Sequence, residues 1–178
     1  NEWPMSHDQI GDVIIVKVPE PLLNHQKEIG KAMLQQHSNA RVVCADNGVK
    51  GEFRVRDLTI ISHDNSATTR TKVKESGSQF WVDPGRAYYS PRLANERIGT
   101  VDCAKNLSSK LGRKISVCDP YAGVGPALMP LSGLEDSIEG IFASDLNPKA
   151  VELLSLNLPN HWTACRDARQ LANELPEC

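Results

Sequence analysis

The sequence lacks several features that would assign it to a large class of proteins at once. No stretch approaches the roughly 20 consecutive apolar residues that cross a bilayer, and the first ten residues lack the apolar core of a signal peptide. Internal repeats and low-complexity tracts are also absent. With 178 residues, 40% hydrophobic and 24% charged, the composition is that of a folded globular protein with one domain or two small ones. We therefore expect a soluble, cytoplasmic protein with no membrane partner.

Metal-binding and redox motifs are missing as well. The five cysteines are scattered and include no C-x-x-C pair, and the five histidines have no spacing that suggests a shared metal ion. We therefore predict reduced thiols and no metal site.

No charge of one sign dominates the chain, whose formal net charge is −2. The charges are nevertheless unevenly distributed. Residues 1–116 hold 17 basic against 13 acidic side chains, whereas residues 117–178 hold 3 against 9. The mildly basic front half can meet a polyanion, although an ordinary solvated surface explains a surplus of this size equally well.

The front half is rich in predicted strands. Runs of β-branched and alternating residues predict strands at 12–18, 41–44, 52–62, 70–74 and 79–82, and apolar spacing predicts a helix over 22–36. Alternation along a strand places Arg54 and Arg56 on one face, and Arg70, Lys72 and Lys74 on one face of another strand. The turn Asp83-Pro84-Gly85 then predicts a boundary, with a small α+β domain over 1–85 and a second domain over 86–178.

The back half alternates between helix and strand. Ser90 and Pro91 predict the start of a helix that runs to Leu111, with Ser90 as the N-cap and Gly112 as the stop. Strands are predicted at 115–118, 140–144 and 162–165, separated by a helix that ends at Leu131 and by a helix over 148–158. This order is typical of the α/β class with a parallel, doubly wound sheet.

A glycine loop follows the first strand of this alternating half. Asp119 ends the strand, Gly123 and Gly125 turn the chain, and Asp145 lies 20 residues after Gly125 at the end of the next strand. In open α/β sheets such loops bind ligands, and an acidic residue at this distance can bind ribose hydroxyls. Asp119 would repel a pyrophosphate, so the pattern favours a nucleoside that carries a cation, namely S-adenosylmethionine. The alternative is a turn that only joins strand to helix, with Asp145 as a helix cap.

Four segments of the chain resemble the archaeal and eukaryotic tRNA (guanine-N1)-methyltransferases of the Trm5/Tyw2 family. They are 119–126 together with 145–148, the segment YYSPRLANER over 88–97, and the segment GVKGEFRVR over 48–56. The resemblance covers roughly residues 10–170. It implies a class I, Rossmann-like methyltransferase domain that transfers a methyl group from S-adenosylmethionine to N1 of guanosine 37, next to the tRNA anticodon.

The related wybutosine-pathway enzymes transfer an aminocarboxypropyl group at the same tRNA position. Their helix motif usually carries Gly-Asn where this chain has Arg92-Leu93, and an aromatic residue where it has Pro126. Both differences favour methyl transfer, and aminocarboxypropyl transfer stays the alternative.

The resemblance also implies roles for individual residues. Glu96 matches the family's general base, and Arg56 matches the arginine that stabilises negative charge on guanine O6. Arg92 lies four residues before Glu96, so on a helix the two side chains can pair. The cofactor contacts implied by the loop and the resemblance are Arg97, Asp119, Gly123, Gly125, Asp145, Leu146, Asp167 and Ala168. The candidate substrate contacts are Lys50, Arg54, Tyr88 and Arg92. Because the target base must leave its loop, contacts to the RNA backbone are expected from Lys50, Arg54, Arg70, Lys72 and Lys74.

The methyltransferase sheet is expected to be truncated at its C-terminus. Only three strands are predicted after residue 115, and the Asn-Pro motif that ends the family's next strand is absent. A non-catalytic fragment that binds S-adenosylmethionine or tRNA is therefore a further alternative. We expect a monomer, although an open sheet edge in a fragment would favour association.

Overall fold

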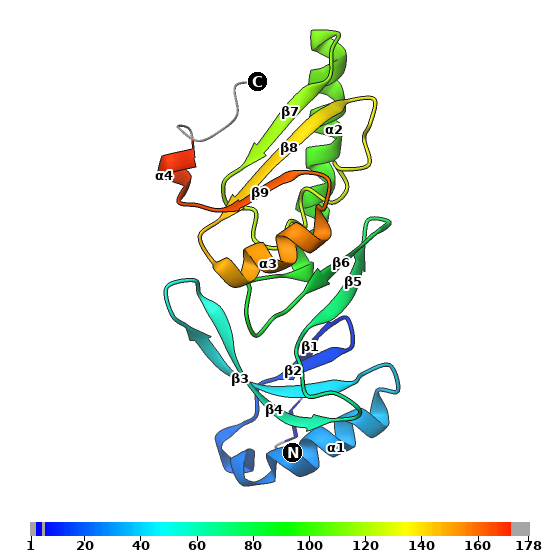
Figure 1. The fold of residues 1–178 in the computed structure, drawn as a ribbon. Coiled ribbons are helices and arrows are strands. Elements are labelled where there is room, and N and C mark those ends of the chain that lie inside the picture. Colours follow the sequence, from blue (N-terminus) through cyan, green and yellow to red (C-terminus); the bar gives the residue numbers. More distant parts are fainter. Residues whose placement is uncertain (1–2, 5, 172–178) are drawn as a thin grey trace.

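The computed structural model describes residues 3–4 and 6–171, and its strands form three separate sheets (Figure 1). A four-stranded sheet lies at the N-terminal end, a two-stranded hairpin lies in the middle, and a three-stranded parallel sheet follows. The structure thus confirms a mixed α/β chain with a small α+β unit in front of a Rossmann-like unit.

The first sheet has the strand order β1-β2-β3-β4. Strands β1 and β2 form an antiparallel hairpin, β2 and β3 are parallel across the helical connection η1–α1, and β3 and β4 are antiparallel. The bounds are β1 His7–Ile10, β2 Val13–Val16, η1 Glu20–His25, α1 Gln26–Gln36, β3 Val42–Lys50 and β4 Val55–His63. Alternate residues of β2 and β3 face α1, where Ile14, Val16 and Val43 pack with Ile29 and Met33.

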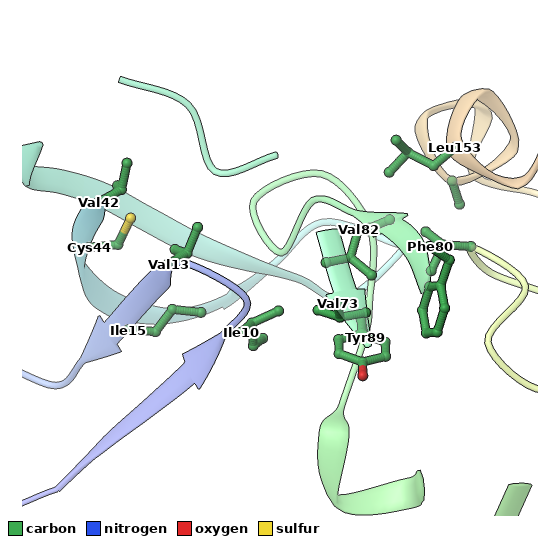
Figure 2. Close-up of a cluster of buried hydrophobic side chains, with 13 residues drawn as sticks. Ile10, Val13, Ile15, Val42, Cys44, Val73, Phe80, Val82, Tyr89 and Leu153 are labelled. Atoms are coloured by element: carbon green, nitrogen blue, oxygen red, sulfur yellow. The ribbon is translucent and has the colours of Figure 1, made fainter. Parts of the chain in front are cut away.

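Strands β5 (Thr71–Glu75) and β6 (Ser78–Val82) form a hairpin with one face buried between the first sheet and helix α3. Its two-residue turn has positive φ angles of 50° at Ser76 and 83° at Gly77, which suits the twist of a tight hairpin. Figure 2 shows Val73, Phe80 and Val82 of the hairpin in one hydrophobic cluster with side chains of the first sheet and with Leu153 of helix α3. This shared core joins the front and back units, and the division at residue 85 stays a prediction.

The back unit confirms the predicted alternation of helix and strand. Strands β7 (Ile115–Asp119), β8 (Ile138–Asp145) and β9 (Trp162–Cys165) are parallel in that order. The helices are η2 Pro91–Leu93, α2 Ala94–Leu111, α3 Pro148–Asn157 and α4 Ala168–Leu171. Asn147 caps α3 because its side-chain oxygen accepts a hydrogen bond from the backbone N–H of Lys149, at 2.9 Å.

The prediction of a helix that ends at Leu131 is wrong. Residues 120–137 form a series of turns, in which the Gly125 carbonyl accepts hydrogen bonds from Leu128 and Met129 and the Leu128 carbonyl accepts them from Leu131 and Ser132. Pro130 has no N–H and cannot continue an α-helical ladder through this point. The apolar side chains that suggested a helix are buried all the same, because Leu128 and Leu131 belong to the core of the parallel sheet.

Two further features differ from the predictions. The helical segment begins at Pro91 with Ser90 at its N-cap position, as predicted, but the Ser90 side chain forms no cap hydrogen bond, and η2 precedes the α-helix that begins at Ala94. Strand β1 was not predicted, because the segment His7–Ile10 is mostly polar and has no run of β-branched residues. Its pairing with the fully buried strand β2 makes it a strand.

The exposed edge of the parallel sheet is lined by apolar side chains. Within the described residues β7 pairs only with β8, and Leu107 and Leu111 of α2 are about half exposed, at 48% and 50%. A cavity of about 840 Å³ lies between α2 and β7. In the described part of the chain no helix is long and apolar enough to span a bilayer, and no cluster of ligating side chains could hold a metal ion.

The glycine at position 125 is predicted to be required for both conformation and packing. Gly125 and Gly77 share a φ of 83°, but a Cβ at Gly125 would lie 2.8 Å from Leu154 Cδ1, whereas one at Gly77 meets nothing within 4 Å. Gly77→Ala should therefore lower the free energy of unfolding by about 1 kcal/mol through backbone strain alone. Gly125→Ala should cost a further ~1–3 kcal/mol from overpacking. Urea unfolding of both variants measures the difference, and equal losses would contradict the packing argument.

Candidate active site

The glycine loop is held against the carboxyl edge of the parallel sheet by Asp145. Its Oδ2 accepts a hydrogen bond from the Gly123 N–H at 2.8 Å, and its Oδ1 accepts one from the Asn147 N–H at 2.9 Å. Gly123 has a φ of 56°, and among the described residues the only atom near the position of a Cβ is the Tyr88 carbonyl oxygen, at 3.9 Å. The loop backbone is thus fixed from one side and open to a ligand from the other.

Two carboxylates lie together beside this open backbone. Burial raises the pKa of Asp119, and the negative charge of Asp145 raises it as well, while the hydrogen bond from the Tyr121 N–H lowers it. Both effects that raise the pKa disfavour the ionised form, and a cation placed nearby would offset them. The electrostatics therefore suit a positively charged ligand.

The third predicted acidic residue follows strand β9. Arg169 donates hydrogen bonds to the Asp167 carboxylate from its side chain and its backbone N–H, and these lower the pKa of Asp167 to about 2. Leu146 is about half exposed beside Asp145, and Ala168 begins α4. Asp119 and Asp145 thus end β7 and β8, and Asp167 follows β9, at one edge of the parallel sheet.

A second cavity, of about 630 Å³, contains Arg56. It is lined by Asp8, Asp46, Gly48, Val49, Phe53, Arg54, Arg56 and Tyr88. The Arg56 Nη2 donates to Asp8 at 2.7 Å and its Nη1 donates to Asp46 at 3.4 Å, so the guanidinium is held between two strands of the first sheet. Arg54 lies in the turn before β4, with a φ of 51°, so the shared strand face predicted for Arg54 and Arg56 is wrong although both line this cavity.

Arg92 pairs with Asp8 rather than with Glu96. The Arg92 Nη2 lies 2.9 Å from Asp8 Oδ1, and no Arg92–Glu96 pair forms in the described structure. The predicted i, i+4 pair is wrong because Arg92 belongs to η2, before the α-helical geometry begins at Ala94. Asp8 consequently bridges the two arginines, and mainly the hydrogen bond from Arg56 lowers its pKa.

Glu96 is exposed on the first turn of α2 and lines the larger cavity together with Asp119. The structure therefore brings Glu96 to the glycine-loop side and Arg56 to the other cavity. Tyr88 lies between these two regions, since its exposed side chain lines the Arg56 cavity and its carbonyl faces Gly123.

Two side chains that are predicted to contact the cofactor or the substrate form ion pairs within the protein. Arg97 is 8% exposed; its Nη1 donates to both oxygens of Glu75 at 2.6 and 2.7 Å, and its Nη2 donates to the Ser90 carbonyl at 2.8 Å. Lys50 pairs with Asp57 at 2.5 Å on the β3–β4 hairpin. Direct contacts of Arg97 with a cofactor and of Lys50 with a substrate stay predictions.

Sequence reasoning missed the acidic partners of these arginines. Asp8 and Asp46 hold Arg56, and Glu75 holds Arg97. Asp8 and Glu75 are 48 and 22 residues away from the arginines that they bind, so no local spacing marks either pair. Recognising β1 as a strand beside β2 would have been the one available signal for Asp8.

The parallel sheet, the glycine loop at its carboxyl edge and the acidic residues after β7 and β8 define a Rossmann-like protein with a nucleoside-type binding site. Residues 71–162 match the family described as the TRM5/TYW2 methyltransferase domain, and residues 1–62 match the TYW2 N-terminal domain. The chain therefore belongs to the TRM5/TYW2 methyltransferase family.

Similar proteins include the tRNA (guanine(37)-N(1))-methyltransferase Trm5b of Pyrococcus abyssi, which is 35% identical over 156 residues, covering 87% of this chain and 44% of that enzyme. The crystal structure of P. abyssi Trm5b superposes with a TM-score of 0.75 at 34% identity, over 94% of this chain and 49% of that one. A complex of aTrm5 with tRNALeu gives a TM-score of 0.72 at 32% identity, over 93% and 48% of the two chains. The chain spans about half the length of these relatives.

The Asp8 bridge is predicted to stabilise the fold in a pH-dependent way. Because the pKa of Asp8 is lowered in the folded state, its contribution is present above the unfolded value of about 4 and lost as the pH falls through the folded value. Asp8→Asn should lower the free energy of unfolding by about 1 kcal/mol at pH 7, and this deficit should shrink below pH 4.

Denaturant unfolding at a series of pH values measures the deficit. Asp57→Asn is a matched control because it breaks only the exposed pair with Lys50, and it should cost less than about 0.5 kcal/mol. An Asp8→Asn deficit that is unchanged at pH 3 would show that the carboxylate charge is not responsible.

Proposed function

We propose that the chain is the cofactor-binding and base-binding part of a tRNA (guanine-N1)-methyltransferase that modifies guanosine 37. One observation carries this proposal. The cavity that holds Arg56 meets the glycine loop at Tyr88, whose side chain lines the cavity and whose carbonyl faces Gly123. A base in the cavity would thus lie next to a nucleoside cofactor at the loop. The similarity to Trm5b, at 35% identity, supports the reaction.

The residues at the loop fit S-adenosylmethionine. The open backbone at Gly123 admits a ligand, and the raised pKa of Asp119 beside Asp145 favours a neighbouring cation such as a sulfonium or ammonium group. Asp145 retains free lone pairs for ribose hydroxyls, because each of its oxygens accepts one backbone hydrogen bond. We propose Leu146, Asp167 and Ala168 as neighbours of the adenosine moiety. When bound, S-adenosylmethionine supplies the methyl group as an electrophile.

Side chains of the protein accept a proton from the base and stabilise the negative charge that develops on it. Guanine N1 carries a proton at neutral pH, so this proton must leave as the new N–C bond forms. Glu96 is the proposed base: it is exposed and lines the same cavity as Asp119, and the described structure shows no ion pair to its carboxylate. Loss of the proton moves negative charge to guanine O6, where the Arg56 guanidinium, already oriented by Asp8 and Asp46, can donate a hydrogen bond.

Arg54, Tyr88, Arg92 and Lys50 are the proposed substrate contacts. The target base must leave its loop to reach the methyl group, and an exposed aromatic side chain such as Tyr88, 61% exposed, can stack on it. Arg54 lines the same cavity, so it can bind the flanking phosphate.

The cytoplasmic location and the monomeric state stay predictions, and sedimentation of the purified chain tests the monomeric state.

Aminocarboxypropyl transfer is the second candidate because residues 1–62 match the TYW2 N-terminal domain. The two reactions use the same cofactor and the same tRNA position, so only the product separates them. The purified chain would be incubated with S-adenosylmethionine and an unmodified tRNA transcript that carries guanosine 37, and the digested nucleosides would be identified by mass spectrometry. N1-methylguanosine supports the proposal, an aminocarboxypropyl nucleoside supports the alternative, and bound cofactor without product supports a non-catalytic binding unit.

Glu96→Gln should abolish most of the methyl transfer. Loss of a general base costs about 10²–10⁴-fold in rate, whereas the affinity for S-adenosylmethionine should change less than about twofold, because the amide keeps the size of the side chain. Single-turnover rates and calorimetric titration measure the two quantities. Glu28→Gln, on the exposed surface of α1, is the matched control. An unchanged rate in Glu96→Gln would remove Glu96 from the mechanism.

Asp119→Asn should stabilise the fold and weaken cofactor binding. The pKa of Asp119 is raised in the folded state, so its charge at neutral pH opposes folding, and the opposition disappears as the pH falls below the unfolded value. We expect a Tm increase of roughly 1–2 °C at pH 7 and at least a tenfold loss of affinity for S-adenosylmethionine, or about 1.4 kcal/mol. Thermal melts and titration measure both. Asp136→Asn, in an exposed turn, should change neither, and a lower Tm for Asp119→Asn would contradict the electrostatic argument.

A further inference from the structure

A second positively charged surface lies on the β5–β6 hairpin, outside the site described above. Arg70, Lys72 and Lys74 are exposed, whereas Thr71 and Val73 between them are 5% and 8% exposed. The predicted alternation is present in β5, where it places Lys72 and Lys74 on the outward face, and Arg70 lies directly before the strand.

Trp81 of the neighbouring strand orients two of these cations without neutralising them. Lys72 and Trp81 are directly opposite in the strand register, and the Lys72 Nζ lies 4.7 Å from the centre of the indole ring. The Arg70 Cζ lies 4.6 Å from the same ring. Such cation–π contacts fix a side chain while its N–H groups stay available. In the described structure, none of Arg70, Lys72 and Lys74 forms an ion pair.

The surface is also hollowed and lined by hydroxyl groups. A cavity of about 570 Å³ is bordered by Arg70, Lys72 and Trp81 and by the hydroxyl residues Ser66, Thr68 and Thr71. Among the described residues Asp12 is the single acidic one in its wall, and Arg41 holds it through two hydrogen bonds of 2.8 and 3.1 Å. Arg41 also donates to the carbonyls of Ser66, Thr68 and Arg70, which fixes the segment that leads into the hairpin. Cations beside hydroxyl donors form a typical phosphate-binding environment.

The hairpin is fixed relative to the proposed active site. At its turn, Glu75 accepts hydrogen bonds from Arg97 of α2 and from the Tyr89 hydroxyl, the latter at 2.8 Å, and Tyr89 is adjacent to Tyr88. At its other end, Asn157 of α3 exchanges hydrogen bonds with the backbone N–H and carbonyl of Trp81, at 2.8 and 2.9 Å. The cationic face therefore keeps a constant position next to the site.

We infer that the outward face of the β5–β6 hairpin, formed by Arg70, Lys72, Lys74 and Trp81, binds the phosphodiester backbone of the RNA substrate at a distance from the reacting base. The identity of the RNA rests on the proposed function, whereas the binding itself does not. The Trp81 ring is covered by its two cations, so the face contacts phosphates rather than stacking on bases. Backbone contacts of this kind contribute affinity and position and leave sequence recognition to the active site.

The test measures the salt dependence of RNA binding by the purified chain. Fluorescence anisotropy with an unmodified tRNA transcript gives Kd at several salt concentrations, and each phosphate that the protein no longer neutralises reduces the slope of log K against log salt by about 0.7–0.9. The triple variant Arg70→Gln, Lys72→Gln, Lys74→Gln should reduce this slope by about 2 and raise Kd at least tenfold. Trp81→Leu should raise Kd roughly two- to fivefold, without a change in slope, because the charges remain but lose their orientation.

A matched triple variant separates this surface from a general effect of net charge. Lys27→Gln, Lys105→Gln and Lys114→Gln remove the same number of charges from exposed positions elsewhere in the chain, and together they should leave Kd within about twofold. Circular dichroism confirms that each variant is folded. The inference is overturned if the hairpin variant binds like the original chain, if both triple variants lose equal affinity, or if the original chain binds no RNA. Salt-dependent binding without any nucleoside product would retain this inference and favour a non-catalytic binding unit over methyl transfer by this chain.

Discussion

Burial of the inner face of the β5–β6 hairpin between the first sheet and helix α3 is the constraint on which the rest of the structure depends. Val73, Phe80 and Val82 pack with Ile10, Val13 and Ile15 of the first sheet on one side and with Leu153 of α3 on the other (Figure 2). This cluster is shared by the front and back units, whereas α1 covers the other face of the first sheet and the parallel sheet has a core of its own. The buried pair of Glu75 and Arg97, reinforced by the Tyr89 hydroxyl, then fixes α2 against the hairpin turn. The two halves of the proposed active site consequently keep one relative position.

The proposed site has an acidic side and a basic side. Asp119, Asp145 and Asp167 lie at the carboxyl ends of the parallel strands, where they favour a cationic cofactor. Arg54 and Arg56 lie in the cavity of the first sheet, where they favour an electron-rich base or a phosphate. The uneven charge of the chain, basic before residue 117 and acidic after it, follows this division. A methyl transfer from a sulfonium to an anionic nitrogen requires this order of charges, since each reactant is held beside charges of opposite sign.

Asp8 shows how a side chain outside the reacting groups can organise them. Its carboxylate accepts hydrogen bonds from Arg56 of β4 and Arg92 of η2, and it thereby connects the first sheet to the segment that carries Tyr88 and Glu96. A guanidinium fixed by two carboxylates loses little conformational entropy when a base binds beside it. Two acidic partners also lower its effective charge, so the cavity attracts a polar base more selectively than an exposed arginine would.

The sequence by itself determined the elements whose signals are local. The predicted order of strands and helices included β7, β8, α3 and β9, and the glycine loop with Asp119 and Asp145 predicted the ligand-binding edge. These signals are local because apolar periodicity and glycine conformations depend on neighbours in the chain. The resemblance added Glu96, which lines the larger cavity, and Arg56 and Tyr88, which line the second one.

Only the tertiary structure determined which charged side chains form ion pairs. Strand β1 forms because it pairs with β2. Turns replace a helix over 120–137 because Pro130 interrupts the hydrogen-bond ladder. Arg92 forms its ion pair with Asp8 instead of Glu96. The pairs that orient Arg56 and Arg97 join residues far apart in the sequence. Their partners are therefore set by the packing of sheets and hairpin around a shared core, and no local pattern encodes that packing.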